Sequence, residues 1–478
     1  VGQQYPDIIP AITDSGTNSA GPADVSGGRP ASRVPSPTAT GPDLVALEQA
    51  GTITGPRLHG YTRWEFELPD DAGEAVAELT YEGDMLFLSV YGPAGHVGSF
   101  MDPRARGRVT LQARWSRLEA SRGLLPGRLE PGPWHVLIDH GPDLVATSYR
   151  LRVSYRSMVR ADAGSQTDDG HPSDGDHVPA VADRFIPDAH VLSGQAGWYR
   201  GELHAHTRES DGIASPAELS RAAEEAGLDF ISLTDHFTVS GWAGMRTSLA
   251  GRTLLIRGCE ITSRRGHANL HGMSAPIDPS VDGDGWTMND VADAVHAQGG
   301  LFCVNHPFSG LLGWRADDFD WRNADAMEVV HALEGPGNVM QQGLWDHHLR
   351  AGRHIVGVAG TDSHDPDNGD HRLGRLVNWV YAYEQSESGI VDAIRRGRVV
   401  ASRGPFVDFR ARRSAESSHE TNEDEGQLYG LWDTIPCPSP PGEIELSVGV
   451  HTPEPVRVFV LKDGLPFVHG WVAPNAAG

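Results

Sequence analysis

The chain has 478 residues, enough for about three domains, and its 39% hydrophobic and 22% charged residues are typical of a globular protein. A net charge of -25, and no run approaching the roughly 18 apolar residues of a membrane helix, argue against nucleic-acid and membrane partners. Only Lys462 among the 39 basic residues is a lysine, which argues against a P-loop, a pyridoxal Schiff base and a two-metal site bridged by a carboxylated lysine.

The first segment, residues 1–42, is rich in Gly, Pro, Ser, Thr and Asp, which predicts a poorly ordered or surface-draped arm. It opens without a methionine and without the basic and apolar regions of a leader, so we expect that any leader was removed or never present. We expect a soluble protein, with export to the periplasm favoured over a cytoplasmic location.

Short alternating runs separated by Gly and Pro turns predict a β-sandwich domain over residues 43–157. The clearest runs are 61–68, 85–91, 134–138 and 149–153. Residues 158–197 are polar and acidic, which predicts a linker.

Strand and helix patterns alternate from residue 198 to 405, which predicts an α/β fold with a parallel barrel. A capping box, Ser215-Pro216-Ala217-Glu218, predicts the start of one helix, and Gly227 its end. Residues 406–478 return to alternating strands and predict a small β appendage. The predicted barrel strands are 201–206, 229–236, 253–261, 267–273, 301–306, 325–332, 354–361 and 377–383.

Several common catalytic motifs are missing from the sequence. It contains no G-x-S-x-G, H-E-x-x-H or G-x-G-x-x-G, so serine hydrolase, zincin and Rossmann functions lose their usual support. Cys259, Cys303 and Cys437 form no C-x-x-C pair and indicate neither a disulfide framework nor a cysteine zinc site.

Histidine and acidic residues gather at the ends of the predicted barrel strands. Each motif alone is more often structural, but unpaired imidazoles and carboxylates are costly to bury, so six such strand ends indicate a polynuclear metal site. In a parallel barrel these ends face one mouth. The candidate ligands are His204, His206, Asp211, His236, Glu260, His267, His306, Asp362 and His364.

These motifs resemble those of the PHP (polymerase and histidinol phosphatase) superfamily over about residues 198–405. The resemblance rests on His204-x-His206, Ser210-Asp211-Gly212, Asp235-His236, Cys259-Glu260, Asn305-His306-Pro307 and Asp362-Ser363-His364. Two further runs, Gly266-His267-Ala268-Asn269 and Arg398 to Pro405, are similar to the CehA/McbA-type branch, which includes carbaryl (aryl N-methylcarbamate) hydrolases.

The resemblance implies a distorted seven-stranded barrel that holds two or three divalent ions, which would be zinc, manganese or iron. Asp211 stands where many members have histidine, and His271 competes with His267 for one ligand position, so the filling of the third position stays open. By motif, the first ion would be held by His204, His206, Glu260 and His364, the second by Glu260, His267 and His306, and the third by Asp211, His236 and Asp362.

A carboxylate that bridges two cations indicates hydrolysis, because a water held between the ions becomes acidic enough to act as a hydroxide nucleophile near neutral pH. The nucleophile would attack the carbonyl carbon of a carbamate or carboxylic ester. The same ligands would equally serve a phosphate ester. The catalytic candidates are Glu260, His236 and His364, while Asp235 is interpreted as structural.

The residues after the strand ends suggest a substrate class. Aromatic walls suit an aryl group, so we expect a small, uncharged aromatic substrate and predict an aryl N-methylcarbamate hydrolase. A PHP-type phosphoesterase and a binding protein that uses the β-sandwich with an inactive barrel remain alternatives, and a homodimer remains open. The candidate substrate contacts are Phe308, Trp314, His331 and Arg208, with Phe237, Trp242 and His371 near the same mouth.

Overall fold

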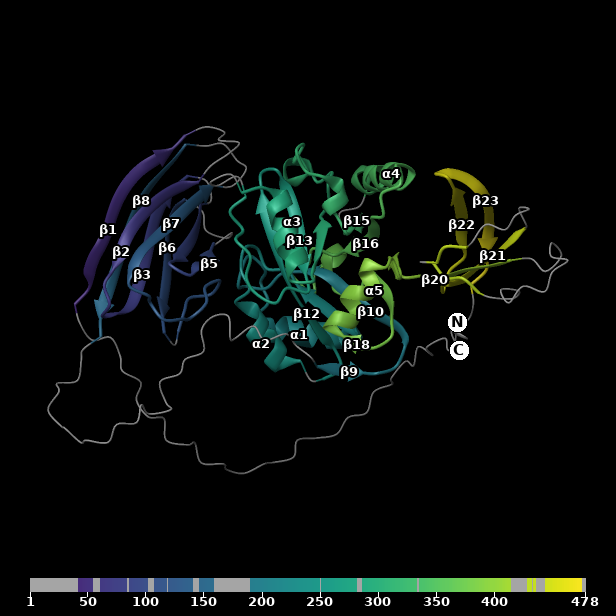
Figure 1. Cartoon of the computed structure of the whole chain (residues 1–478), viewed down its shortest axis with the longest axis horizontal. Helices are drawn as coiled ribbons and strands as arrows, with labels where there is room; N and C mark the ends of the chain where they lie inside the picture. Colours follow the sequence, from purple (N-terminus) through teal and green to yellow (C-terminus); the bar gives the residue numbers. More distant parts are fainter. Residues whose placement is uncertain are drawn as a thin grey trace, which may run out of the picture. The chain divides into compact units, whose positions relative to one another are not determined.

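The structure is a computed structural model that describes most of the chain. In it, the chain forms two compact units (Figure 1). The unit Ala39–Gly404 contains two adjoining parts, and the other unit contains the C-terminal strands. The predicted arm, most of the predicted linker, residues 414–427 and Cys437 lie outside the described residues. The described residues are 42–54, 61–83, 86–101, 107–117, 119–140, 146–158, 190–249, 251–281, 286–332, 335–413, 428–431, 433–435 and 443–474.

Two four-stranded antiparallel sheets, over residues 44–157, share one hydrophobic core. In β6 every second residue is buried, because successive strand side chains point to opposite faces of a sheet. The first sheet has the order β1 (Leu44–Ile53), β8 (Thr147–Ser157), β3 (Ala72–Glu82) and β6 (Arg108–Ser116). The second has the order β2 (Thr62–Leu68), β7 (Gly132–His140), β4 (Leu86–Gly92) and β5 (Gly95–Phe100).

A nine-stranded sheet forms the second part of this unit and curls into a nearly closed barrel. An isolated parallel bridge joins Ala205 at the end of β10 to Ser363 after β16, which brings the two ends of a seven-stranded run together. The sheet order is β16 (Val356–Gly360), β15 (Ala326–His331), β14 (Leu301–Val304), β13 (Gly266–His271), β12 (Leu254–Ser263), β11 (Phe230–Leu233), β10 (Gly197–Ala205), β17 (Val377–Ala382) and β19 (Val399–Ser402).

The expectation of a wholly parallel barrel is wrong. Strand β13 runs antiparallel to both of its neighbours, β12 and β14, and β17 runs antiparallel to β10. The reason is the length of the connection: only Arg264 and Arg265 separate β12 from β13, whereas a parallel pair needs a crossover of a dozen or more residues. As a result, the first residues of β13, not its last, lie at the same end of the barrel as the last residues of β12.

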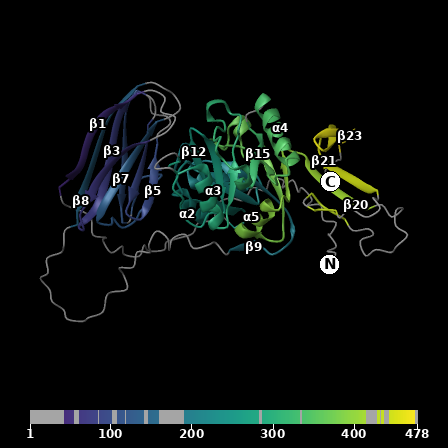
Figure 2. The same cartoon turned by 45° about the horizontal axis from the view of Figure 1, so that its top comes forward.

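In the described part of the chain, five α-helices lie between strands of the barrel, and Figure 2 labels α2 to α5 among them. The predicted capping box is confirmed: the Ser215 hydroxyl accepts from the Glu218 amide, the Glu218 carboxylate accepts from the Ser215 amide, and Gly227 follows the helix with a φ of 66°. The helices are α1 (Pro216–Glu225), α2 (Gly241–Ser248), α3 (Met288–Ala297), α4 (Pro336–Arg350) and α5 (Glu387–Arg395).

The remaining strands form three two-stranded sheets. Strands β9 (Val191–Ser193) and β18 (Gln385–Ser386) pair beside the barrel, while β20 (Phe406–Arg413) with β21 (Ile444–His451) and β22 (Val456–Lys462) with β23 (Leu465–Val472) make up the C-terminal unit. Among the described residues, none of the helices combines the length and apolar character that crossing a bilayer would require.

Candidate metal centre

Imidazoles and carboxylates from six strands and their following loops converge at one end of the barrel. Their ligand atoms form five overlapping groups, and within each group all atoms lie within 4.8 Å of one another. Carboxylate and imidazole ligands in such groups suit divalent cations. The residues of these groups are His204, His206, Asp211, His236, Glu260, His306, Glu328, His331, Asp362 and His364.

Glu260 lies in the middle of the cluster and is fully buried. Its Oε1 accepts from the Asn305 amide at 2.8 Å and lies 3.1 Å from His267 Nδ1 and 3.6 Å from His306 Nε2. Its Oε2 faces the other way, 3.4 Å from His204 Nε2 and 2.9 Å from His236 Nδ1. One carboxylate therefore offers an oxygen to each of two histidine sets, which is what the bridging role requires.

The antiparallel direction of β13 places His267, rather than His271, beside Glu260. His267 pairs with Thr262 near the end of β12 and contacts Glu260, although it belongs to none of the five groups. His271 pairs with Gly258, and its Nδ1 lies 2.8 Å from the Ser232 hydroxyl. Burial lowers the pKa of His271 to about 3, so it is a neutral residue of the barrel interior.

The positions of Asp362 and His364 are exchanged relative to the expected ligand sets. Asp362 Oδ1 lies 3.0 Å from His206 Nε2 and 3.3 Å from His204 Nε2, whereas His364 Nε2 lies 3.0 Å from Asp211 Oδ2. The cause is the turn after β16: Asp362 has a φ of 53°, and the neighbouring Ser363 pairs with the backbone of β10. A positive φ at a non-glycine residue is costly, and such strain often occurs at functional sites.

The cluster contains a buried carboxylate, Glu328, that the sequence reasoning missed. Its Oε1 lies 2.7 Å from His204 Nδ1, and its Oε2 accepts from the His306 amide at 2.7 Å. A Cβ on Gly360 would lie 1.7 Å from Glu328 Oε1, so any larger residue there would displace this carboxylate. A carboxylate within the apolar strand Ala326-Met327-Glu328-Val329 was the signal that could have revealed it.

His331, a predicted substrate contact, lies in the structure within two of the five groups of candidate ligand atoms. It is buried, and its Nε2 lies 3.5 Å from Asp362 Oδ2. It groups with His306 and Asp362, and also with His204 and Glu328.

The charges of the cluster shift one another's pKa values strongly. Burial alone would lower the pKa of His204, but the carboxylates of Asp362, Glu260 and Glu328 outweigh it and raise that pKa well above 6.5. Burial would raise the pKa of Glu260, but the imidazolium charges of His204 and His236 hold it well below 4.5. Burial lowers the pKa of His206 to about 4, with help from His364 and His236. The site therefore requires positive charge among its carboxylates.

The hydrogen-bond pattern fits a cation between these groups. Because the carboxylate of Glu328 can only accept, His204 donates from Nδ1, and Nε2 becomes an acceptor once a cation replaces the second proton of the imidazolium. This Nε2 faces Glu260 Oε2 and Asp362 Oδ1, which are also acceptors. Among the described residues, neither His204 Nε2 nor Glu260 Oε2 has a hydrogen-bond partner. Buried hydrogen-bond acceptors that face one another offer their lone pairs to the same space, which is the arrangement that binds a divalent cation.

The other residues expected near the substrate lie in several different environments. Phe308 is half-exposed two residues after His306, and Arg208 is exposed, with its amide bonded to Ala214. Trp314 packs in an aromatic cluster with Phe302, Phe319 and Trp321. Phe237 is buried beside His236, Trp242 is buried with its indole N–H bonded to the Gly258 carbonyl, and His371 Nδ1 lies 3.0 Å from the Thr361 carbonyl oxygen.

We expect Glu328→Gln to weaken divalent metal binding by about 10- to 100-fold, the range typical of residues that orient a histidine ligand. Glutamine can still accept from the His306 amide, but its own amide group cannot satisfy the N–H of His204 Nδ1. Competition with a fluorescent chelator measures the affinity. Glu225→Gln, an exposed change on α1, is the matched control, and unchanged affinity in Glu328→Gln would refute the orienting role.

Comparisons with known proteins found distant similarities. No family model matches the chain. An uncharacterized protein of Methanocaldococcus jannaschii, MJ1587, is 26% identical over 157 residues, which cover 29% of this chain and 86% of that protein.

Two solved structures are similar to parts of the chain. One is a two-domain protein from Bacteroides vulgatus containing a predicted PHP-like metal-dependent phosphoesterase, with 17% identity, a TM-score of 0.37, and coverage of 58% of this chain and 95% of that chain. The other is an amidohydrolase from Chromobacterium violaceum, with 16% identity, a TM-score of 0.27, and coverage of 35% and 88%.

Proposed function

We propose that this protein is a metal-dependent hydrolase whose centre is the cluster around Glu260, and that it cleaves a carbamate or carboxylic ester, in the first place an aryl N-methylcarbamate. The observation that carries the proposal is the carboxylate of Glu260, whose two oxygens face two separate histidine sets. The resemblance of the motifs to the PHP superfamily, and to its carbaryl-hydrolase branch, supports the same proposed function.

Two or three divalent ions would supply Lewis acidity and a nucleophilic water of lowered pKa. His204, His206, Glu260 and Asp362 would hold one ion, and Glu260 with His267 and His306 a second. Asp211, His236 and His364 form the third group of candidate ligands, together with His206. Glu328 fixes the ring of His204 and the backbone of His306.

The number of bound ions sets the net charge of the cluster, and this net charge suits one substrate class or the other. It holds four carboxylates, those of Asp211, Glu260, Glu328 and Asp362. Two divalent ions would balance them and leave a centre suited to an uncharged carbonyl substrate. A third ion would leave a charge of roughly +2, which suits a phosphate ester. A PHP-type phosphoesterase is therefore the second candidate, favoured if the third position is filled.

His364 is the most accessible imidazole of the cluster, with a side chain 37% exposed. Burial would lower its pKa, but the hydrogen bond and charge of Asp211 raise it to about 9. With two ions bound, this imidazolium would be the group able to give a proton to a leaving group, and the proton would be the Nε2 proton that Asp211 Oδ2 otherwise accepts. With a third ion bound, the same nitrogen would be one of its ligands. His364 thus has a role in either candidate reaction.

The test is an assay of the full chain reconstituted with Mn²⁺ or Zn²⁺ against 1-naphthyl N-methylcarbamate, an aryl acetate and an aryl phosphate. We expect kcat/KM to be highest for the carbamate or the acetate. A preference for the phosphate of more than about tenfold would contradict the carbonyl substrate and support the phosphoesterase. Inactivity on all three substrates, with under one ion bound per chain, would favour a binding function of residues 44–157, the two-sheet domain.

A further inference from the structure

Residues 121–125 of the two-sheet domain form a loop that contacts the two barrel loops carrying Asp211 and His236. The Gly123 amide donates to Glu209 Oε2 at 3.0 Å, and the Gly123 carbonyl accepts from the Thr238 hydroxyl at 2.7 Å. Glu209 is two residues before Asp211, and Thr238 is two residues after His236. A single residue of the two-sheet domain, Gly123, therefore contacts both ligand-bearing loops through its backbone N–H and C=O.

The fit around Gly123 is too close for any other residue. Gly123 has a φ of 78°, and a Cβ there would lie 2.1 Å from the Ser99 carbonyl oxygen and 3.0 Å from that of Glu209. On its other side, Gly98 has a φ of 150°, and a Cβ there would lie 2.1 Å from the Gly123 carbonyl oxygen. The loop is thus fixed against β5 of its own domain, and its contacts with the barrel have little freedom to shift.

On the barrel side, the two loops are also tied to each other. Glu209 Oε2 accepts from the Ser240 hydroxyl at 2.8 Å, and the Ser240 amide donates to the Thr238 hydroxyl at 3.1 Å. Asp235, next to His236, accepts from the Thr207 amide and hydroxyl and from the Ser210 hydroxyl. These hydrogen bonds link the loops of Asp211 and His236 to each other, and both loops contact Gly123.

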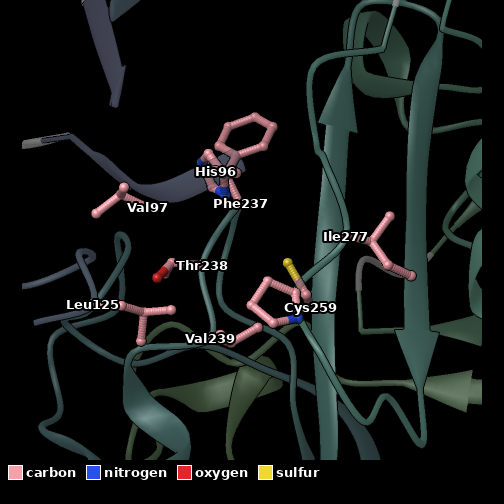
Figure 3. Close-up of a pocket in the computed structure, with 10 residues that line it drawn as sticks. His96, Val97, Leu125, Phe237, Thr238, Val239, Cys259 and Ile277 are labelled. Carbon is pink, nitrogen blue, oxygen red and sulfur yellow. The ribbon is translucent and has the colours of Figure 1, made fainter. Parts of the chain in front are cut away.

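Apolar contacts from the same two elements surround this anchor. Figure 3 shows a pocket where Val97 and Leu125 of the two-sheet domain face Thr238 and Val239 of the barrel, with Cys259 close by. Phe237 packs edge-on against Phe87 of β4, with ring centroids 6.1 Å apart. Of the two anchor hydrogen bonds, the one from the Thr238 hydroxyl is buried, and a low local dielectric strengthens such a bond.

The other ligands are held within the barrel. His204 and His206 lie on β10 and directly after it, and Glu260 lies on β12. His306 is fixed by Glu328, and Asp362 by the pairing of Ser363 with β10. The loops of Asp211 and His236, by contrast, receive hydrogen bonds from outside the barrel, at Glu209 and Thr238.

We propose that the two-sheet domain is a positioning element for the third cation position, and that it acts through Gly123, Glu209 and Thr238. The inference rests on the metal centre proposed above and adds a function for the N-terminal domain. A cation in the third position changes the charge that a substrate meets. The contact of Gly123 with Glu209 and Thr238 would therefore influence the substrate class as well as the number of bound ions.

The experiment titrates chelator-treated full-length protein with Mn²⁺ by calorimetry. The variants are Thr238→Val and Glu209→Ala, and Thr253→Val is the matched control, since its buried hydroxyl donates to the Leu228 carbonyl at the opposite end of β12. We expect the weakest Mn²⁺ affinity to fall by about 10- to 100-fold in both variants, with the tighter affinities unchanged. Amide hydrogen exchange over residues 207–211 should become faster in both variants and stay unchanged in the control.

Three results would overturn the inference. If the wild type binds several ions and both variants keep the weakest affinity, the positioning role is wrong, whereas the proposed hydrolase centre stands. If all affinities fall equally in both variants, the contact supports the whole barrel and not the third position. If the wild type binds no Mn²⁺, both the inference and the proposed function fail.

Discussion

Replacing Glu260 with glutamine should lower kcat/KM by about 10³-fold or more, since it removes several kcal/mol of charge stabilisation from the reacting centre. Glutamine keeps the size of the side chain and an oxygen that accepts from Asn305. It removes the negative charge that faces His204, His206 and His236. We also expect the loss of at least one bound ion per chain, because a neutral amide is a poor bridge between two cations.

The Glu260→Gln experiment needs a check on folding, because Glu260 is fully buried. Circular dichroism and the thermal transition should resemble those of the wild type in metal-free buffer. Glu225→Gln, an exposed site on α1, is the matched control. A folded Glu260→Gln variant that retains wild-type turnover would contradict the bridging role.

Removing the metal with a chelator should abolish turnover and lower the melting temperature, and the loss of stability should grow as the pH rises. A ligand present at a thousand times its dissociation constant stabilises the folded state by about 4 kcal/mol, so each bound ion contributes on that scale. Without ions, protonated histidines must balance the buried carboxylates.

The direction of the pH effect follows from the shifted pKa values. The pKa of His364 is raised to about 9, and those of His204 and His236 also lie well above 6.5. Stability from a raised histidine pKa is fully present below about 6.5 and is lost as the pH rises through the folded-state value. Chelator-treated protein should therefore melt at a lower temperature at pH 9 than at pH 6.5, whereas metal-loaded protein should change less. An equal gap at both pH values would count against this balance of charges.

Much of the centre could be predicted from the sequence because parallel strands present their carboxyl ends at one mouth. Glu260, His236 and His306 each come at or near the end of an apolar run of the sequence, and the structure brings them together. His204 and His206 are two residues apart, a spacing that places side chains on one face of a strand, and both join the cluster.

The rest depended on features that a strand pattern does not contain. The two-residue connection from β12 to β13 reverses the strand, which selects His267 over His271. The positive φ of Asp362 directs that side chain to His204 and His206, and its exchange with His364 could not be foreseen. The contact of Gly123 with Glu209 joins residues 86 positions apart, which no local pattern shows.

The most direct test of the central claim is anomalous diffraction from crystals grown with Mn²⁺, since it locates each ion. We expect a peak on either side of Glu260, one near His204, His206 and Asp362 and the other near His267 and His306. A third peak near Asp211, His236 and His364 would favour the phosphoesterase. A well-ordered structure with no peak within bonding distance of Glu260 would contradict a metal-dependent hydrolase.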